Sequence, residues 1–344
     1  MPTTYAIPDG RVAMAATLYT GTLLSNAVSN AVNGISFQPD WVWLKSRSAA
    51  TSHKLTDSVR GVTKGLVSNS TAAETTDVQG LTSFSSGGFT VGTNTDYNNL
   101  AATYVAWQWK ANGAAVSNTD GSITSSVSAN TTAGFSVVSA TTTSAAGTIG
   151  HGLGVAPSLI IGVNRAAPNG WWVYHASRGA TKYLVLNTTA AEVTAASVWN
   201  NTEPTSTVFS QGSGGWNNAA TAIFYCFAPV AGYSAFGSYT GNGSADGPFV
   251  YLGFRPRWIM IKSSTAVTSW EIWDTSRDTS NTMNAELYPN LSIAETNATT
   301  NNRPIDSVSN GFKIRGTDAQ VNTSGQTYIY ACFAENPFKY ANAR

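Results

Sequence analysis

Short runs of large apolar residues alternate along this chain with stretches rich in Gly, Asn, Ser and Thr. The runs at 41–45, 159–163 and 258–262 are five residues long, and each begins two residues after a proline. Aromatic and β-branched residues dominate them, which predicts strands with both faces covered. No window keeps an apolar period of 3.6 over ten residues, so no long helix is expected.

A second series of runs predicts the last strand of each third of the chain. Bulky side chains alternate at 104–109, 223–227 and 328–333, as expected of a strand with one buried face. Further strands are predicted at 53–56, 171–174 and 270–273, and at 88–91 and 311–314, with Val208-Phe209 as their counterpart in the middle third. Short strands between polar turns indicate an all-β, antiparallel fold.

These elements recur because the chain contains three copies of one sequence unit. Adding 118 superposes the first copy on the second without a gap over about seventy residues. The shift carries Pro39 to Pro157, Arg60 to Arg178 and Glu74 to Glu192, and a third copy follows with small slips at Pro256, Arg277 and Glu295. A residue present three times is a poor candidate for a unique catalyst, so the repetition favours a scaffold or a multivalent binder.

The repeats predict three tandem antiparallel β-sandwich modules of the jelly-roll or lectin-like type. Their expected ranges are 1–112 with a short N-terminal tail, 113–231, and 232–344 with a C-terminal tail. The Tyr-Thr-Gly pattern at 19–21 recurs at 239–241 and indicates the opening strand of a module. The small polar link at 112–130 is expected to contain a turn at Asp120-Gly121, whereas the more aromatic link at 229–243 is expected to be packed.

Composition narrows the classes of function. Only 11% of the residues are charged, which suits a protein exposed outside a cytoplasm, and the net charge is +1 without a basic run. Nucleic-acid binding is therefore not expected. The first ten residues do not resemble a signal peptide, and no apolar stretch is long enough to span a bilayer, so no membrane insertion is expected either.

The two cysteines and three histidines do not predict a disulfide or a zinc site. Cys226 and Cys332 occupy matching places in separate repeats, so two buried free thiols are expected. The histidines at 53, 151 and 175 do not cluster with them in the sequence. The segment 94–98 offers oxygen ligands at alternate positions but lacks the glycine and glutamate of an EF-hand, so neither a metal nor a cofactor is predicted.

Several segments of the repeats are specific enough to suggest a family. They are FQPDWVWLKSRS at 37–48, DSVRG at 57–61, TAAE at 71–74, GFTVG at 88–92 and TYVAW at 103–107. In these segments, and over nearly its whole length, the chain resembles structural proteins of tailed-phage virions, many from marine phages, that are described as tail-fibre-like or lectin-like. The resemblance implies a virion protein that is made in the cytoplasm of a bacterial host and contacts other virion proteins.

Three arginines are candidate binding residues. Arg60, Arg178 and Arg277 each follow a predicted strand, with Asp57, His175 and Asp274 three positions earlier. An arginine–carboxylate fork can grip a sugar or a neighbouring subunit. The favoured alternative is that each arginine fastens its own loop by bonding backbone carbonyls.

Three tryptophans are candidates for sugar stacking. Trp171, Trp199 and Trp216 lie beside Asn and Gly in irregular segments, where an exposed ring can stack on the face of a sugar. The favoured alternative places them in the core or at an interface between modules, as expected for the tryptophans on predicted strands.

Glutamates are the candidates for an enzyme. Glu74, Glu192 and Glu271 are the residues on which a polysaccharide depolymerase would depend, with an acid and a base roughly 5–10 Å apart. Acidic residues are few, however, and the pairs Asn69/Glu74, Asn187/Glu192 and Asn290/Glu295 are typical of turn chemistry. A non-enzymatic protein is therefore predicted.

The sequence and the resemblance together predict a structural protein on the virion exterior, similar to a tail fibre or spike. Host surface glycans are its candidate ligands, and a homo-oligomer is expected. The alternative is a capsid decoration protein, which the lack of coiled-coil heptads favours. Partner recognition is expected in the polar inserts after Glu74, Glu192 and Glu295, where the copies differ.

Overall fold

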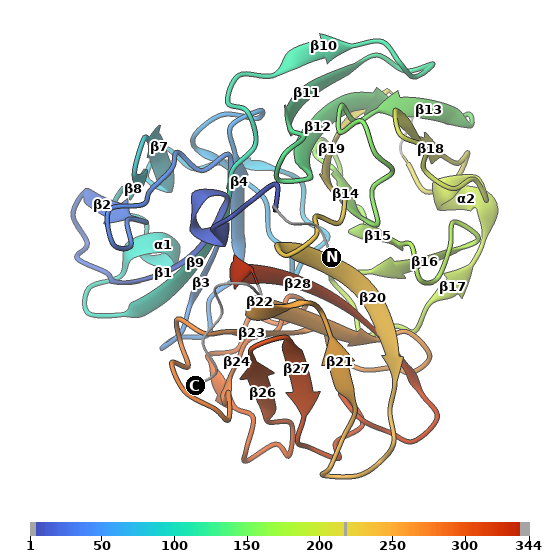
Figure 1. Cartoon of the computed structure of the whole chain (residues 1–344). Helices are drawn as coiled ribbons and strands as arrows, with labels where there is room; N and C mark the ends of the chain where they lie inside the picture. Colours follow the sequence, from blue (N-terminus) through green and yellow to red (C-terminus); the bar gives the residue numbers. More distant parts are fainter. Residues whose placement is uncertain (1–4, 217–218, 338–344) are drawn as a thin grey trace.

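The computed structural model describes residues 5–216 and 219–337 and is built almost entirely of antiparallel strands (Figure 1). Helical structure in the described residues is limited to a 3₁₀ turn, η1 (Gly10–Val12), and two single-turn helices, α1 (Thr95–Asn98) and α2 (Ala196–Trp199). The prediction of an all-β fold is confirmed. The predicted tails fall partly on residues 1–4 and 338–344, which lie outside the described residues.

The described part of the first repeat contains a four-stranded sheet of order β1-β9-β3-β4 and a three-stranded sheet of order β2-β8-β7. Their bounds are Met14–Thr20 (β1), Asn26–Ser29 (β2), Trp41–Ser46 (β3), Lys54–Asp57 (β4), Leu81–Ser85 (β7), Gly88–Val91 (β8) and Thr103–Trp109 (β9). A short pair joins β5 (Lys64–Gly65) to β6 (Thr75–Thr76). Buried side chains from both sheets, among them Val28, Leu44 and Phe89, form one apolar cluster between them.

The second repeat has the same central order, β12-β19-β14-β15, inside a sheet of eight described strands. The bounds are Val116–Asn118 (β10), Ser125–Asn130 (β11), Phe135–Thr142 (β12), Leu159–Asn164 (β14), Trp172–His175 (β15), Lys182–Val185 (β16), Val193–Thr194 (β17) and Ala220–Phe227 (β19), with a separate pair of Gly147–Gly150 (β13) and Val208–Gln211 (β18). The polar link, for which only a turn was predicted, contains two strands. Its strands β10 and β11 extend the sheet, because Val127 and Ala129 supply an apolar side that packs on the repeat's core.

The third repeat returns to the arrangement of the first, with sheets of order β20-β28-β22-β23 and β21-β27-β26 in its described residues. The bounds are Ser234–Thr240 (β20), Phe249–Tyr251 (β21), Phe254–Ser263 (β22), Glu271–Asp274 (β23), Ala285–Glu286 (β24), Thr296–Asn297 (β25), Ile305–Val308 (β26), Gly311–Ile314 (β27) and Thr327–Pro337 (β28). The link before it is packed as predicted, since Tyr233 and Tyr239 are buried.

The last strand of each repeat is buried on both faces, whereas the alternation of its side chains predicted one buried face. In β9, Tyr104 and Ala106 face the cluster inside the first repeat. Val105, Trp107 and Trp109 face a larger cluster that draws residues from all three repeats. The expectation was wrong because the smaller side chains of the strand were assigned to a solvent-exposed face. Ala106, one of them, is fully buried.

The three repeats meet at a triangle of aromatic rings. Trp109, Phe227 and Phe333 are equivalent, since each pairs with the first residue of the matching five-residue run, at 41, 159 and 258. Their ring centroids lie 6.1, 5.5 and 5.6 Å apart, and the ring planes meet at 68°, 62° and 68°, for the pairs Trp109–Phe227, Phe227–Phe333 and Trp109–Phe333 in turn. Three edge-to-face contacts of nearly equal geometry mark a pseudo-threefold axis, and each contributes about 0.5–1.5 kcal/mol beyond burial.

The ring of repeats closes where the start of the first repeat packs on the third. The carbonyl of Ala16 accepts hydrogen bonds from Ser276 Oγ at 2.8 Å and Arg257 Nη2 at 3.3 Å. The turn η1 lies so close to β28 that a Cβ on Gly10 would stand 2.1 Å from the carbonyl oxygen of Ala334. Figure 1 shows the resulting three lobes around a common centre. The predicted division into separate sandwich modules at 112/113 and 231/232 stays a prediction, and the shared core adds contacts that it did not include.

Candidate functional site

The triplicated polar residues lie at the junctions between neighbouring repeats. In the first repeat, the buried Arg60 donates from Nε to Asp57 Oδ2 at 2.5 Å and from Nη2 to the carbonyl of Leu55 at 2.9 Å. Burial alone lowers the pKa of Arg60, but the charge of Asp57 outweighs it and raises that pKa well above its ordinary value. Arg277 repeats both contacts, at 2.6 Å to Asp274 and 3.0 Å to the carbonyl of Ile272. Neither guanidinium is exposed to grip a sugar.

A glutamate then ties each of these arginines to another repeat. Glu74 accepts from Arg60 Nη1 at 3.0 Å and, in the second repeat, from Arg165 Nε and Nη2 at 2.8 and 2.9 Å. Glu295 accepts in the same way from Arg277 at 3.2 Å.

The matching contact of Glu295 leads back to the first repeat, where Arg47 donates from Nε and Nη2 at 2.8 Å each. Burial raises the pKa of Glu74, but bonds from Arg165 and the charge of Arg60 lower it overall. Glu74 is therefore an anion, and Glu74 and Glu295 each join two neighbouring repeats.

The junction between the second and third repeats lacks this bridge. Ser264 stands where Arg47 and Arg165 stand in the other copies, and its carbonyl accepts the backbone N–H of Glu192 at 2.8 Å. The carboxylate of Glu192 is bonded by Arg178 at 2.5 and 2.6 Å and by Lys182, both within its own repeat. In the part of the chain that the structure describes, this junction keeps the backbone contact without the side-chain bridge.

A second set of contacts runs round the ring in the same order. Trp171 Nε1 donates to the carbonyl of Val67 at 3.0 Å, and Trp270 Nε1 donates to that of Val185 at 3.1 Å. The equivalent residue in the first repeat is His53, whose Nε2 lies 2.9 Å from the carbonyl oxygen of Tyr288.

His53 fits this role as a neutral ring. Trp43 Nε1 donates to its Nδ1 at 2.8 Å, which leaves the proton on Nε2 for the carbonyl of Tyr288. Burial lowers the pKa of His53 well below its ordinary value and keeps the ring neutral. These contacts close the ring from the third repeat to the first.

A third set lies next to the axis and differs between junctions. Tyr225 OH donates to Asp57 Oδ2, and Trp107 Nε1 donates to Asp274 Oδ2, each at 2.9 Å. The residue equivalent to Tyr225 and Trp107 in the third repeat is Ala331.

The junction that contains Ala331 has His175 where the others have aspartate. His175 Nε2 lies 3.1 Å from the carbonyl oxygen of Tyr330, and burial lowers the pKa of His175 to about 4. A narrow void, lined by His175, Ala331, Met260 and Trp270 among others, has no room for a water molecule.

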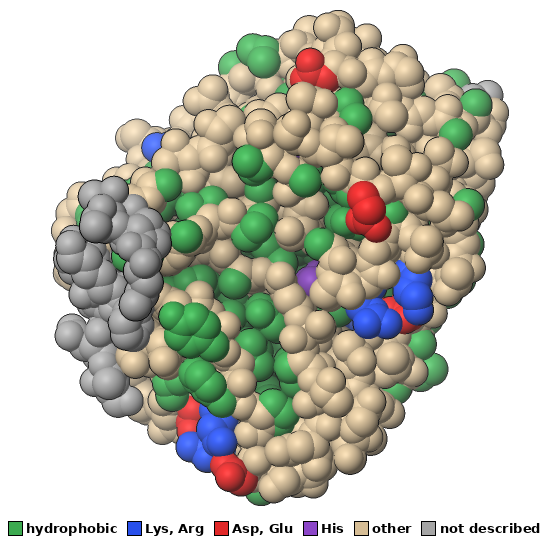
Figure 2. Space-filling model, turned by 45° about the vertical axis from the view of Figure 1, so that its right-hand side comes forward, with side chains coloured by type: hydrophobic (Ala, Val, Ile, Leu, Met, Phe, Trp, Pro, Cys, Tyr) green, Lys and Arg blue, Asp and Glu red, His purple; other side chains and the backbone are tan. Residues whose placement is uncertain are grey.

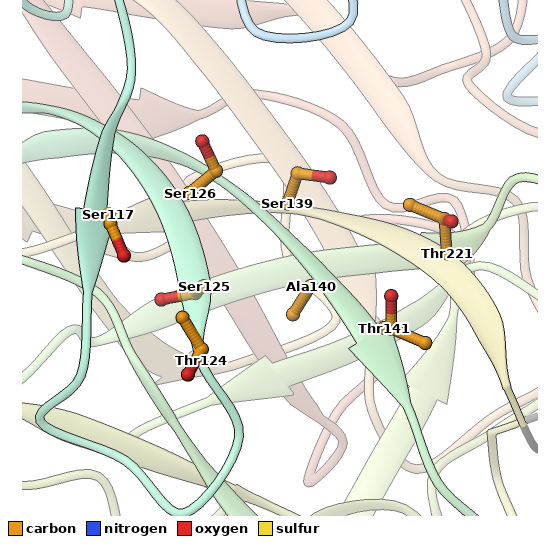
Figure 3. Close-up of a pocket in the computed structure, with 8 residues that line it drawn as sticks. All are labelled: Ser117, Thr124, Ser125, Ser126, Ser139, Ala140, Thr141 and Thr221. Carbon is orange, nitrogen blue, oxygen red and sulfur yellow. The ribbon is translucent and has the colours of Figure 1, made fainter.

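The junction between the first and second repeats and the junction between the third and first repeats open to the surface as hollows. One, of about 260 Å³, lies beside Glu74 and Arg165, and the other, of about 300 Å³, lies beside Arg47, Arg277 and Glu295. A third hollow, of about 340 Å³, is a hydroxyl-lined groove over β10, β11, β12 and β19 (Figure 3). Its lining is Ser117, Thr124, Ser125, Ser126, Ser139, Ala140, Thr141 and Thr221. Thr221 also lines the first hollow, so the groove and that junction adjoin.

The candidate role of these tryptophans in sugar stacking is wrong, and the favoured alternative, burial in the core or at an interface, is confirmed. Trp171, Trp199 and Trp216 are 0%, 2% and 4% exposed. Trp171 lies at a junction, and Trp199 and Trp216 pack on each other in the core of the second repeat, with ring centroids 5.7 Å apart. Sequence reasoning missed Arg47 and Arg165, although the 118-residue shift relates them.

Other candidates have structural roles. In each repeat, an asparagine side chain accepts a hydrogen bond from the backbone N–H of the residue just before β4, β15 or β23, at 2.9 Å. These asparagines are Asn69, Asn187 and Asn290. In the segment 94–98, Asn94 caps α1 and Asn98 donates to backbone carbonyls. Among the described residues, no group of three His, Cys, Asp or Glu is placed to hold a metal ion.

Cys226 and Cys332 are buried free thiols, as expected. In the described ranges, no helix has both the length and the apolar character needed to cross a membrane.

Glu271, the remaining depolymerase candidate, lies in a buried acidic cluster of the third repeat. Its side chain and that of Glu286 are 1% and 0% exposed, and Arg303 Nη1 lies 3.1 and 3.8 Å from their respective oxygens. Burial, followed by the nearby charge of Glu286, raises the pKa of Glu271 well above its ordinary value. Glu271 is therefore enclosed, and burial disfavours the charged form of its carboxyl group.

Comparison with known proteins gives a family. The chain matches the family described as "Domain of unknown function (DUF7483)" over residues 13–337, a range that contains all three repeats. No curated protein and no solved structure matches the chain significantly. The protein with this closed ring of repeats belongs to the DUF7483 family.

Proposed function

We propose that the protein is a non-enzymatic structural component of the exterior of a tailed-phage virion, similar to a tail fibre or spike, and that it binds host surface glycans. The observation that carries the proposal is the pseudo-threefold ring, with its aromatic triangle and junctions that run from each repeat to the next. Such a ring presents three related surfaces about one axis and suits a rigid part of a symmetric assembly.

The polar residues of the junctions support a structural role. Glu74, Glu192 and Glu295 are held by basic side chains at hydrogen-bond distance, and two of the arginines, Arg60 and Arg277, also donate to backbone carbonyls. A glycosidase needs one carboxyl group that stays protonated near an open site. The junction carboxylates Glu74 and Glu192 have lowered pKa values instead, and Glu271 is enclosed.

Glycan binding is supported by the surface hollows. The two junction hollows and the adjoining serine and threonine groove offer hydroxyl, guanidinium and carboxylate groups at the surface. Repeated weak contacts on one rigid body gain avidity for a repeated ligand, without any single strong site. This suits a host polysaccharide.

Location on the particle tests the virion proposal. Phage particles would be labelled with gold-conjugated antibody and imaged by cryo-electron microscopy. Label at the tail is the expected result, and its absence from the whole particle would overturn the proposal. Retention of host cells by immobilised protein tests glycan binding separately, and treatment of the cells with a polysaccharide-degrading enzyme should abolish it.

Capsid decoration is the second candidate, and the pseudo-threefold axis favours it. A single chain with three related faces fits the local threefold positions of a capsid lattice, where three copies of a capsid protein meet. Label over the capsid lattice with none at the tail would select this function. A homo-oligomer remains part of either proposal, and light scattering of the purified protein measures it.

A further inference from the structure

The third repeat exposes two aromatic side chains side by side on an edge strand. Phe249 and Tyr251 of β21 are 48% and 61% exposed, whereas Val250 between them is 7% exposed and faces the core. The strand β21 lies at the end of the order β21-β27-β26. Exposed neighbouring rings on a protein with few charges mark an interaction surface.

The fold itself does not require these rings, as the other repeats show. Phe249 lies opposite Lys313, and Tyr251 lies opposite Gly311. The equivalent positions, as given by the same register, are Ala27 and Ser29 in the first repeat and Thr148 and Gly150 in the second. The first and second repeats thus have small or hydroxylated residues at the two positions where the third repeat has a phenylalanine and a tyrosine.

The geometry lays the phenyl ring of Phe249 along the sheet. A Cβ on Gly311 would stand 3.1 Å from Phe249 Cε2, so the phenyl ring lies across the bare backbone of this glycine and shows its other face to solvent. Residues two apart on a strand emerge about 7 Å apart.

Charged side chains flank the rings in balanced numbers. Lys313 Nζ lies 2.6 Å from Asp246 Oδ1, and Arg315 lies 2.6 Å from Asp306 through Nε and 3.9 Å from Asp246 through Nη1. The side chain of Asp246 is 82% exposed and free to accept further bonds. Figure 2 shows one face of the molecule, on which hydrophobic side chains lie directly beside such a group of basic and acidic ones.

We propose that Phe249 and Tyr251, with Asp246 and Lys313 at their margin, form a binding platform for a neutral glycan built of pyranose rings. Aromatic faces stack on the C–H faces of sugars, and charged side chains at the margin bond hydroxyl groups. Two basic and two acidic residues balance, which suits an uncharged ligand better than a polyanion. The inference rests on the proposed glycan binding and names the site and the ligand class.

The test replaces the rings with the residues of the first repeat. The variant Phe249→Ala with Tyr251→Ser should fold, because the same backbone already carries alanine and serine at these positions. Binding would be measured on an array of neutral hexose oligosaccharides and on purified host surface polysaccharide. The wild type should bind, and the double variant should lose at least tenfold in affinity.

A matched control removes exposed apolar surface elsewhere. Leu24→Ser with Leu100→Ser changes two side chains of the first repeat that are 69% and 65% exposed, and its binding should equal that of the wild type. Asp246→Asn, which leaves both rings in place, should weaken binding severalfold. If the double variant fails to fold, Asp246→Asn tests the platform in its place.

The outcomes separate the site from the function. Binding by the wild type that survives in both platform variants would overturn the platform and leave the proposed glycan binding intact. A wild type that binds no neutral or charged glycan would overturn both. Loss of self-association in the double variant, seen by sedimentation without any change in glycan binding, would assign the rings to a second copy of this chain instead.

Discussion

The junction between the first and second repeats and the junction between the second and third use the same positions with different chemistry. At the first, Tyr225 donates to Asp57, which is also paired with Arg60. At the second, a neutral His175 meets a backbone carbonyl beside Ala331. Both residues of the pair differ between the two junctions, and at each junction the donor still has an acceptor. Each of these buried polar groups therefore remains hydrogen-bonded. The ring is therefore set by backbone contacts and aromatic packing, and the polar pairs can be exchanged within it.

The largest expected effect comes from breaking the buried ion pair. Arg60→Met removes the partner of Asp57 while keeping the length of the side chain, and it should lower the free energy of unfolding by about 3–5 kcal/mol. Denaturation with guanidinium chloride measures this. Arg178→Met is the control at the other junction, where the side chain is 21% exposed and should cost about 1 kcal/mol or less. Equal losses would remove the distinction between the junctions.

The pH dependence of stability should reveal the histidine junction next. Burial lowers the pKa of His175 to about 4 from its ordinary value of 6.5, so between these values the unfolded chain binds more protons than the folded one. Stability then falls as the pH drops through this window, by on the order of 3 kcal/mol from His175.

His175→Gln keeps a donor near Tyr330 and titrates no longer. It should reduce the slope of unfolding free energy against pH by up to about 1.4 kcal/mol per pH unit. His53 and His151 also have lowered pKa values and preserve part of the slope. An unchanged slope would show that His175 is not held neutral.

Exchange of the junction chemistry is the third experiment. His175→Asp alone buries a carboxylate that lacks the tyrosine donor of the first junction, and Ala331→Tyr alone overfills the site. Together they recreate the pair of Asp57 and Tyr225, so the double variant should be more stable than the sum of the single losses by about 1–3 kcal/mol. Urea unfolding of all four proteins gives this coupling, and strict additivity would disprove the pairing.

The smallest expected effect comes from adding the side-chain bridge that the junction between the second and third repeats lacks. Ser264→Arg gives Glu192 the partner that Glu74 has in Arg165, and it should stabilise the protein by about 0.2–1 kcal/mol at low salt. The gain should shrink in high salt because the pair lies near the surface. Arg165→Ser is the reciprocal change, and thermal unfolding at both salt concentrations compares the two. A loss of stability in Ser264→Arg would indicate that the junction between the second and third repeats is spaced differently.

The strands and the repeats could be predicted because apolar runs, turn residues and the 118-residue shift are local signals. The shared core could not, since it depends on how repeats meet. Trp171 shows the reason, because its neighbours are typical of a surface loop while its indole is buried against Val67 of another repeat. Arg47 and Arg165 escaped notice because Ser264 breaks the triplet. Long-range pairs of this kind leave no periodic pattern in the sequence.

The aromatic triangle at the axis has a genetic consequence. In a trimer of identical subunits, every substitution appears in all three subunits, so a change that is favourable in one subunit also alters the other two. In this single chain, the three repeats around Trp109, Phe227 and Phe333 are encoded separately, so each repeat can change alone. One repeat can then acquire Phe249 and Tyr251 while the others keep small residues there. The molecule keeps the rigidity of a trimer and gains the freedom to present one distinct face.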